Sequence, residues 1–319
     1  MELLKERLGC GTSTQWKSSS DALVSVVIGI VEACALIGKK LSTGLVTKIG
    51  SVNDFGDEQL SVDLLAEKIF NEWAEGEASI KYTSSEESID LKEVHKDGKF
   101  IVCWDPLDGS SIIDCNWSVG SIVGVWESGP PGDDVLLGKT GRQLVCSIMA
   151  VYGPRINVLL GLRGEVFDLI YIKDDFYVLP LSPVIKKAGA RIFSPANIRA
   201  TNDLMGYKAL VDYWLEKKYT LRYTGGLVPD VYQIFQKGNG IFSNPASENA
   251  PAKLRLVYEV APIAYLIEHA NGRTSDGRCS ILDIPIENMD QRVPFCGGTA
   301  EEVERFETFL RNHGLPLSS

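Results

Sequence analysis

The feature that most constrains the fold of this chain is a short apolar run that ends at an acidic turn. Residues 100–104 read Phe-Ile-Val-Cys-Trp, and the run stops abruptly at Asp105-Pro106. Proline cannot donate a ladder hydrogen bond, and turn-forming residues follow it, so the pattern predicts a buried β-strand closed by a turn. Such a strand delivers Asp105 to the edge of a sheet, and the turn returns Asp108 three residues later.

This turn carries the chemistry that a metal and a phosphate group need. Asp105, Asp108 and the carbonyl of Leu107 are hard oxygen ligands of the kind that Mg²⁺ takes. Gly109-Ser110-Ser111 follows with backbone N–H groups and hydroxyls, which can cradle a phosphate. A plain surface turn uses the same residue types. The string follows a buried strand rather than a polar loop, however, so we predict a functional site here.

Three other acidic clusters are weak signals on their own. Asp57 and Asp63 lie near an expected helix start, where acidic residues usually cap the helix. Glu86 and Glu87 are adjacent, and adjacent glutamates are usually solvated. Glu259 directly precedes the apolar stretch Val-Ala-Pro-Ile-Ala, which predicts a buried charge paired with a cation or a metal.

Helical and strand-like spacings alternate along both halves of the chain. Helices are expected near 22–40, 59–73, 206–217, 229–237, 257–271 and 300–312. Strands are expected at 100–104, 119–126, 156–162, 166–172, 192–193, 220–223 and 240–242. Residues 143–152 fit either state, and 74–98 are polar and typical of a loop. The alternation predicts an α/β protein of two domains, residues 1–185 and 186–319.

Charge and hydropathy exclude several kinds of partner. The chain has 32 Lys and Arg against 42 Asp and Glu, a net charge of −10, and no basic block. We therefore expect neither nucleic acid nor an anionic membrane as a partner. The apolar run 22–37 is interrupted by Ser25 and Glu32 and is shorter than the roughly 20 residues that span a bilayer, which favours a buried helix. No targeting segment is recognised, so a cytoplasmic location is expected.

The acidic clusters occur together in a distinctive order. Along the chain come G-D-x5-D, S-E-E, W-D-P-L-D-G-S-S and K-L-R-L-x-Y-E. Between about residues 20 and 310, this order resembles the fructose-1,6-bisphosphatase family of the lithium-sensitive sugar phosphatases. Within that family, residues 53–60, 193–201 and 219–230 are more similar to the branch that acts on sedoheptulose 1,7-bisphosphate. The resemblance implies a layered α/β/α/β/α fold with two mixed-sheet domains.

The resemblance also implies a role for each matching residue. Two or three Mg²⁺ per active site would be held by Glu86, Asp105, the Leu107 carbonyl, Asp108 and Glu259, with Asp57 at a looser metal. The attacking water would be oriented and deprotonated by Asp63 and Glu87. The leaving phosphate would be cradled by Gly109, Ser110 and Ser111, next to Asp108. The sugar and its far phosphate would be held by Asn197, Arg222, Tyr223 and Lys253.

These roles imply a Mg²⁺-dependent phosphoric monoester hydrolase that removes the 1-phosphate of sedoheptulose 1,7-bisphosphate. Because the family's equivalent of Arg222 reaches in from a neighbouring subunit, a homodimer or homotetramer is implied. A fructose-1,6-bisphosphatase or a dual-specificity enzyme is the alternative. A catalytically inactive sugar-phosphate sensor is an alternative of another class, and the complete set of acids argues against it. An inositol monophosphatase is less favoured, because those chains are shorter and lack the Arg222 and Lys253 pair.

Three departures from the family's patterns have consequences. Residues 44–56 contain no cysteine, whereas the plant chloroplast sedoheptulose enzyme has a cysteine pair there, so no thiol switch through this segment is expected. Residues 11–15 do not match the AMP site of the fructose enzyme, so AMP inhibition is not expected. Residues 244–247 lack a tyrosine of the fructose enzyme. We infer room for a seven-carbon sugar and expect Asn244→Tyr to shift preference toward the fructose substrate.

Overall fold

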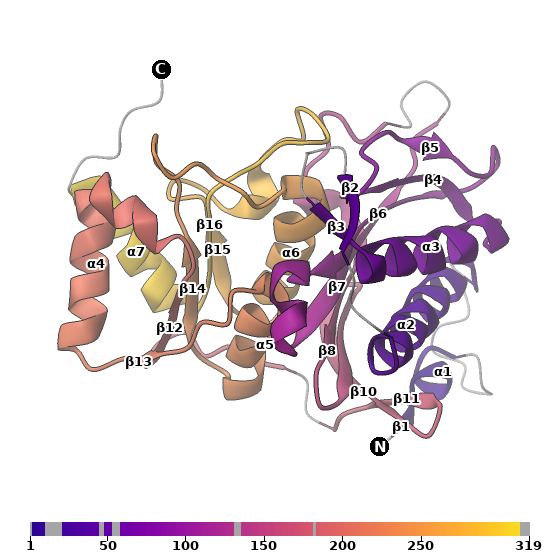
Figure 1. Ribbon diagram of the computed structural model, residues 1–319, viewed down its shortest axis with the longest axis horizontal. Helices are drawn as coiled ribbons and strands as arrows, with labels where there is room; N and C mark the ends of the chain where they lie inside the picture. Colours follow the sequence, from indigo (N-terminus) through magenta and orange to yellow (C-terminus); the bar gives the residue numbers. More distant parts are fainter. Residues whose placement is uncertain are drawn as a thin grey trace.

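Sheets and helices of the chain alternate in five layers. A computed structural model describes residues 2–9, 21–44, 48–52, 58–130, 135–180 and 183–312. Figure 1 shows the order across the molecule as helices, large sheet, helices, small sheet, helices. The layered α/β/α/β/α fold implied by the resemblance is confirmed.

The large sheet lies between the first and second helix layers. In the described ranges it has nine strands in the order β1-β11-β10-β9-β8-β7-β6-β4-β5. Neighbours run antiparallel, except that β4 and β6 are parallel. Its strands are β1 (Glu2–Leu3), β4 (Ile80–Ser85), β5 (Lys92–Glu93), β6 (Phe100–Asp108), β7 (Val119–Glu127), β8 (Leu144–Tyr152), β9 (Ile156–Leu162), β10 (Glu165–Ile172) and β11 (Asp175–Val178).

Helices cover both faces of this sheet (Figure 1). The outer face packs against α2 (Asp21–Leu41) and α3 (Ser61–Gly76), with the short α1 (Leu4–Arg7) at its edge. The inner face packs against α5 (Leu227–Lys237) and α6 (Ala261–His269). Because alternate residues of a strand face opposite sides, β6 contributes to both cores. The outer core contains Phe100, Val102 and Trp104, and the inner core contains Ile101 and Cys103.

Helix α2 is apolar enough to raise the question of a membrane. It is the one helix in the described part of the chain whose length and composition would allow a membrane crossing. Its Val26, Val27, Ile30 and Cys34 have no exposed surface and lie in the outer core. The expectation of a buried helix near 22–40 is confirmed.

The small sheet lies between α5 and α6 on one side and the helices α4 (Met205–Glu216) and α7 (Ala300–Asn312) on the other (Figure 1). Its order is β13-β12-β14-β16-β15, with β12 parallel to both of its neighbours and the rest antiparallel. Two strands form a separate hairpin, β2 (Lys48–Val52) and β3 (Glu58–Leu60). The remaining strands are β12 (Ile192–Pro195), β13 (Thr220–Leu221), β14 (Ile241–Asn244), β15 (Arg273–Ser275) and β16 (Phe295–Gly298).

Several sequence expectations need correction. The polar segment 74–98 is not all loop, because it contains the buried strand β4. Its Ser84 hydroxyl donates to the Ile89 carbonyl at 2.9 Å and bonds the Tyr258 hydroxyl at 2.7 Å, so a polar strand is satisfied inside the core. The ambiguous segment 143–152 is a strand. The helix expected over 257–271 starts as a π-helical turn, Leu256–Val260, before α6. The domain boundary near residue 185 stays a prediction.

Candidate active site

The acidic turn sits at the end of β6, where the ladder with β7 is interrupted. Pairing with β7 shifts register between Asp105 and Asp108, so the strand bulges at Pro106. The backbone N–H of Leu107 donates to Asp105 Oδ1 at 2.9 Å, which fixes the bulge. The strand's alternation then turns Asp105 toward the inner helices, on the same face as Ile101 and Cys103.

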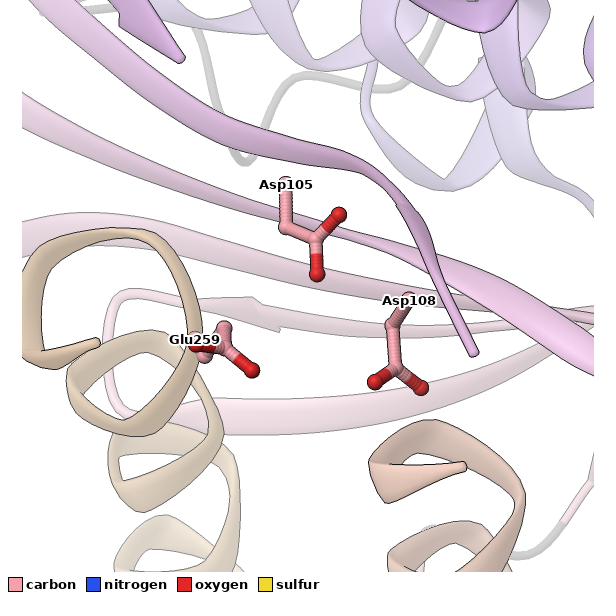
Figure 2. A group of neighbouring side chains, drawn as sticks. All are labelled: Asp105, Asp108 and Glu259. Atoms are coloured by element: carbon pink, nitrogen blue, oxygen red, sulfur yellow. The ribbon is translucent and has the colours of Figure 1, made fainter. Parts of the chain in front are cut away.

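A third carboxylate reaches this turn from far along the chain. Glu259 lies in the π-helical turn before α6, and its Oε2 accepts the backbone N–H of Arg255 at 2.6 Å. Carboxylate oxygens of Asp105, Asp108 and Glu259 all lie within 4.8 Å of one another. Figure 2 shows the three side chains pointing toward a common centre. All three residues are buried, at 3%, 8% and 5% exposure.

Burial and mutual repulsion make this cluster an unstable place for negative charge. Burial, followed by the charges of Glu86, Asp108 and Glu259, raises the pKa of Asp105 well above its usual range. Burial and Glu86 do the same to the pKa of Glu259, and Arg255 partly offsets them. Burial raises the pKa of Asp108 to about 7. Three buried carboxylates of this kind need protons or cations to balance them.

The donor set fits a hard divalent cation. All the ligand atoms are carboxylate oxygens, which Mg²⁺ prefers over nitrogen or sulfur. The cluster also has a basic neighbour that the sequence reasoning missed. Arg255 is 5% exposed, its guanidinium contacts Glu86, and it lies 4.0 Å from Glu259 Oε2. Its position inside the K-L-R-L string, between two leucines, was the available signal of burial.

The structure describes some, but not all, of the remaining predicted acids. Asp63 is 4% exposed and lies in the first turn of α3. Glu86 and Glu87 directly follow β4, and the Glu86 N–H donates to the Trp104 carbonyl at 3.0 Å, beside the acidic turn. Asp57, the predicted ligand of a looser metal, lies outside the described residues, as does the 11–15 segment.

A cavity of about 280 Å³ opens beside the cluster and gathers most of the predicted substrate residues. Asp108 and Ser111 line it from the large-sheet side, next to Gly109, which has a left-handed φ of 84°. Its walls also include residues predicted to hold the sugar, namely Asn197, Tyr223 and Lys253. Arg222 is exposed and does not belong to the described residues that line this cavity.

Two further carboxylates hold the site in shape, and sequence reasoning missed both. Asp230, with no exposed surface, accepts the backbone N–H groups of Thr224 at 2.8 Å and Gly225 at 3.2 Å, next to Tyr223. Burial raises the pKa of Asp230 to about 6. The sequence cue for the burial of Asp230 was an acidic residue within the apolar face of a helix.

Glu67 of α3 connects the ends of β4 and β6. Its Oε1 accepts the Ser85 hydroxyl at 2.9 Å and its Oε2 accepts the Trp104 indole N–H at 2.7 Å. Ser85 and Trp104 directly precede Glu86 and Asp105. Glu67 therefore anchors the two strands one residue before predicted metal ligands. No local pattern distinguishes it from a solvated helix residue.

Known proteins are similar to this chain along nearly its whole length. The family model for the N-terminal domain of fructose-1-6-bisphosphatase matches residues 6–175, and the model for the C-terminal domain matches residues 177–311. The chloroplastic sedoheptulose-1,7-bisphosphatase of Spinacia oleracea is 43% identical over 300 residues, covering 92% of this chain and 76% of that protein. The class 1 fructose-1,6-bisphosphatase of Pelobacter propionicus is 34% identical, covering 91% and 89%.

Solved structures agree in fold. A candidate sedoheptulose-1,7 bisphosphatase from Toxoplasma gondii matches with a TM-score of 0.91 at 46% identity, covering 98% of this chain and 100% of that one. The holo form of Leishmania major fructose-1,6-bisphosphatase matches with a TM-score of 0.87 at 27% identity, covering 97% and 98%. Fold and site together define a phosphoric monoester hydrolase of the sugar bisphosphatase class. The chain belongs to the fructose-1,6-bisphosphatase family.

Proposed function

We propose that this protein hydrolyses the 1-phosphate of sedoheptulose 1,7-bisphosphate, giving sedoheptulose 7-phosphate and phosphate, with Mg²⁺. The observation that carries the proposal is the buried cluster of Asp105, Asp108 and Glu259 beside a polar cavity. The 43% identity to the spinach enzyme, against 34% to the bacterial fructose enzymes, favours the seven-carbon substrate.

The metal would be held by buried carboxylates whose charges repel one another and need protons or cations to balance them. We assign this role to Asp105, Asp108 and Glu259, together with Glu86 and the Leu107 carbonyl. Asp57, which lies outside the described residues, is assigned to the same role. When bound, Mg²⁺ neutralises phosphate oxygens and lowers the pKa of a bound water. The raised pKa values of the cluster mean that cation binding must displace protons, so activity should rise with pH up to neutrality.

The chain's own residues would position the reacting groups. Asp63 and Glu87 orient a water and accept its proton, and hydroxyls and N–H groups of Gly109, Ser110 and Ser111 hold the phosphate that leaves. Asn197, Tyr223 and Lys253 surround the sugar in the cavity, and Arg222 acts from a neighbouring subunit. A homodimer or homotetramer in the cytoplasm completes the proposal.

A fructose-1,6-bisphosphatase or dual-specificity activity is the second candidate, supported by the 34% identical class 1 enzymes. The cavity wall includes Asn244, where we infer that the fructose enzyme has a tyrosine. Asn244→Tyr should therefore narrow the cavity and shift the ratio of kcat/KM values toward the six-carbon substrate. An unchanged ratio means that residue 244 does not set sugar length.

The direct test is phosphate release from the two bisphosphates side by side, with Mg²⁺ and with EDTA. We expect Mg²⁺-dependent release that is faster with the seven-carbon sugar. Asp105→Asn should abolish it, whereas Asp114→Asn, which alters an exposed carboxylate on the adjacent 3₁₀ helix, should not. Faster release from the fructose substrate favours the second candidate. Release from neither substrate, with binding retained, favours an inactive sugar-phosphate sensor.

A further inference from the structure

The described part of the cavity wall carries two cations, of which the sequence predicted one. Among the described residues that line it, Asp108 is the one carboxylate, whereas Arg199 and Lys253 both contribute cations. A substrate with two phosphates carries a second dianion away from the metal cluster, and a cation beside it would balance that charge. Lys253 was assigned to this task from the sequence, and Arg199 was not.

Arg199 is placed to act on a ligand rather than to hold the fold together. It is an exposed residue in the short 3₁₀ helix Ile198–Asn202, and no carboxylate in the described ranges forms an ion pair with it. It lies close enough to Tyr223 for its charge to counteract the effect of burial, which raises the pKa of that phenol. Tyr223 lines the same cavity, so the guanidinium belongs to the sugar-binding end.

Asn197 is less suited to bind a phosphate than the resemblance implies. Its Nδ2 donates to the Pro245 carbonyl at 2.8 Å and to the Ala250 carbonyl at 3.0 Å. An amide has two N–H donors, and both are committed here. A phosphate dianion offers acceptors only, so Asn197 has no donor left for it. Asn197 instead ties the start of the 3₁₀ helix to the 245–250 loop, two residues before Arg199.

Arg222 is also poorly placed to bind the far phosphate within its own chain. Its backbone is fixed to β12, because its N–H donates to the Phe193 carbonyl at 3.0 Å and its carbonyl accepts the Ser194 hydroxyl. Its side chain is exposed and outside the cavity of its own chain. Within one chain, the described cations of the cavity are therefore Arg199 and Lys253.

We propose that Arg199 binds the phosphate that is not hydrolysed, from the same subunit as the metal cluster. The inference rests on the proposed function and adds a residue that selects bisphosphates over monophosphates. Guanidinium groups bind phosphate oxygens in pairs of charge-assisted hydrogen bonds, which lysine cannot reproduce. Asn197 is the positioning residue that holds the helix carrying Arg199.

The test compares substrates with and without the second phosphate. Steady-state kinetics would be measured for Arg199→Ala, Arg199→Lys and wild type on sedoheptulose 1,7-bisphosphate and on fructose 1-phosphate. Arg191→Ala is the matched control, because it removes an exposed arginine near β12 that stacks over Tyr219. We expect Arg199→Ala to lower kcat/KM about 10- to 100-fold on the bisphosphate and less than about twofold on the monophosphate. Arg199→Lys should fall between, and Arg191→Ala should match wild type.

Calorimetric binding of sedoheptulose 7-phosphate gives a readout that does not need turnover. Arg199→Ala should weaken its Kd by about the same factor as kcat/KM for the bisphosphate. Equal losses on both substrates, or an unchanged Kd, would overturn the assignment. If wild type binds the 7-phosphate through Arg199 but releases no phosphate from the bisphosphate, the proposed function fails and the assignment stands.

Discussion

Metal-free protein should lose stability as the pH rises through neutrality, and Asp108 should account for a measurable part of the loss. The pKa of this buried carboxyl rises from 3.8 to about 7 on folding. The folded state therefore keeps a proton that the unfolded state has released between about pH 4 and pH 7. Folding is most favoured at the acidic end of this window, and the full cost appears above pH 7. A shift of roughly 3 units corresponds to roughly 4 kcal/mol.

The assay is thermal unfolding in EDTA at several values between pH 5 and pH 8. Within that range Asp108 contributes about 3 kcal/mol, and a chain of this size changes Tm by about 2 °C per kcal/mol. Relative to Asp108→Asn, wild-type Tm should therefore fall by roughly 4–6 °C from pH 5 to pH 8. The variant keeps one of the two oxygens that accept the Leu227 and Val228 N–H groups, and loss of the other acceptor shifts its Tm at every pH alike. Asp114→Asn, an exposed aspartate, controls for net charge.

Mg²⁺ supplies the second half of this prediction. Added at pH 8, it should restore the lost wild-type stability and have a much smaller effect on Asp108→Asn, because a ligand of the folded state stabilises it. Parallel Tm curves for wild type and Asp108→Asn across the pH range would refute the argument. So would an equal Mg²⁺ effect on both proteins.

Three further changes test contacts that hold the fold together. Glu67→Gln keeps only one of the two oxygens that accept the Ser85 hydroxyl and the Trp104 indole N–H. The free energy of unfolding in urea should therefore fall by about 1–3 kcal/mol. Unchanged stability would show that the Trp104 indole finds another partner. Arg142→Ala removes a half-exposed arginine that pairs with two carboxylates near α6. The free energy of unfolding in urea should fall by about 1 kcal/mol at low salt and by less at high salt. Gly206→Ala places a Cβ 2.4 Å from the Phe309 carbonyl oxygen between α4 and α7, so Tm should fall by several degrees; an unchanged Tm contradicts the close packing.

Local patterns predicted the part of the site that is contiguous in sequence. The apolar run of β6 and the acidic turn after it appear in the structure as a strand and a bulge, because both depend on neighbours within a few residues. Helix α2 was predicted for the same reason. Strand β4 was missed, because its serines are satisfied by partners elsewhere in the chain, and a polar strand has no periodic signature.

The rest of the site depends on contacts between distant segments. Glu259 joins Asp105 across more than 150 residues, and only the odd placement of a charge before an apolar stretch indicated its burial. Arg199 and Glu67 lie on helix surfaces where a solvated charge is the ordinary outcome. Their roles emerge when the fold places a cavity or two strand ends beside them.

Asp108 also accepts hydrogen bonds from the start of α5. Its Oδ1 and Oδ2 take the backbone N–H groups of Leu227 at 3.2 Å and Val228 at 2.7 Å, so one carboxylate of the large sheet is shared with a helix of the middle layer. Each oxygen keeps a further lone pair, so a cation at Asp108 would share the carboxylate with the N–H groups of that helix. If cation binding changed these hydrogen bonds, any shift of α5 would in turn change cation affinity by the same free energy. The same linkage would extend to the loop that carries Tyr223, because Asp230 of α5 accepts the backbone N–H groups of Thr224 and Gly225 in that loop.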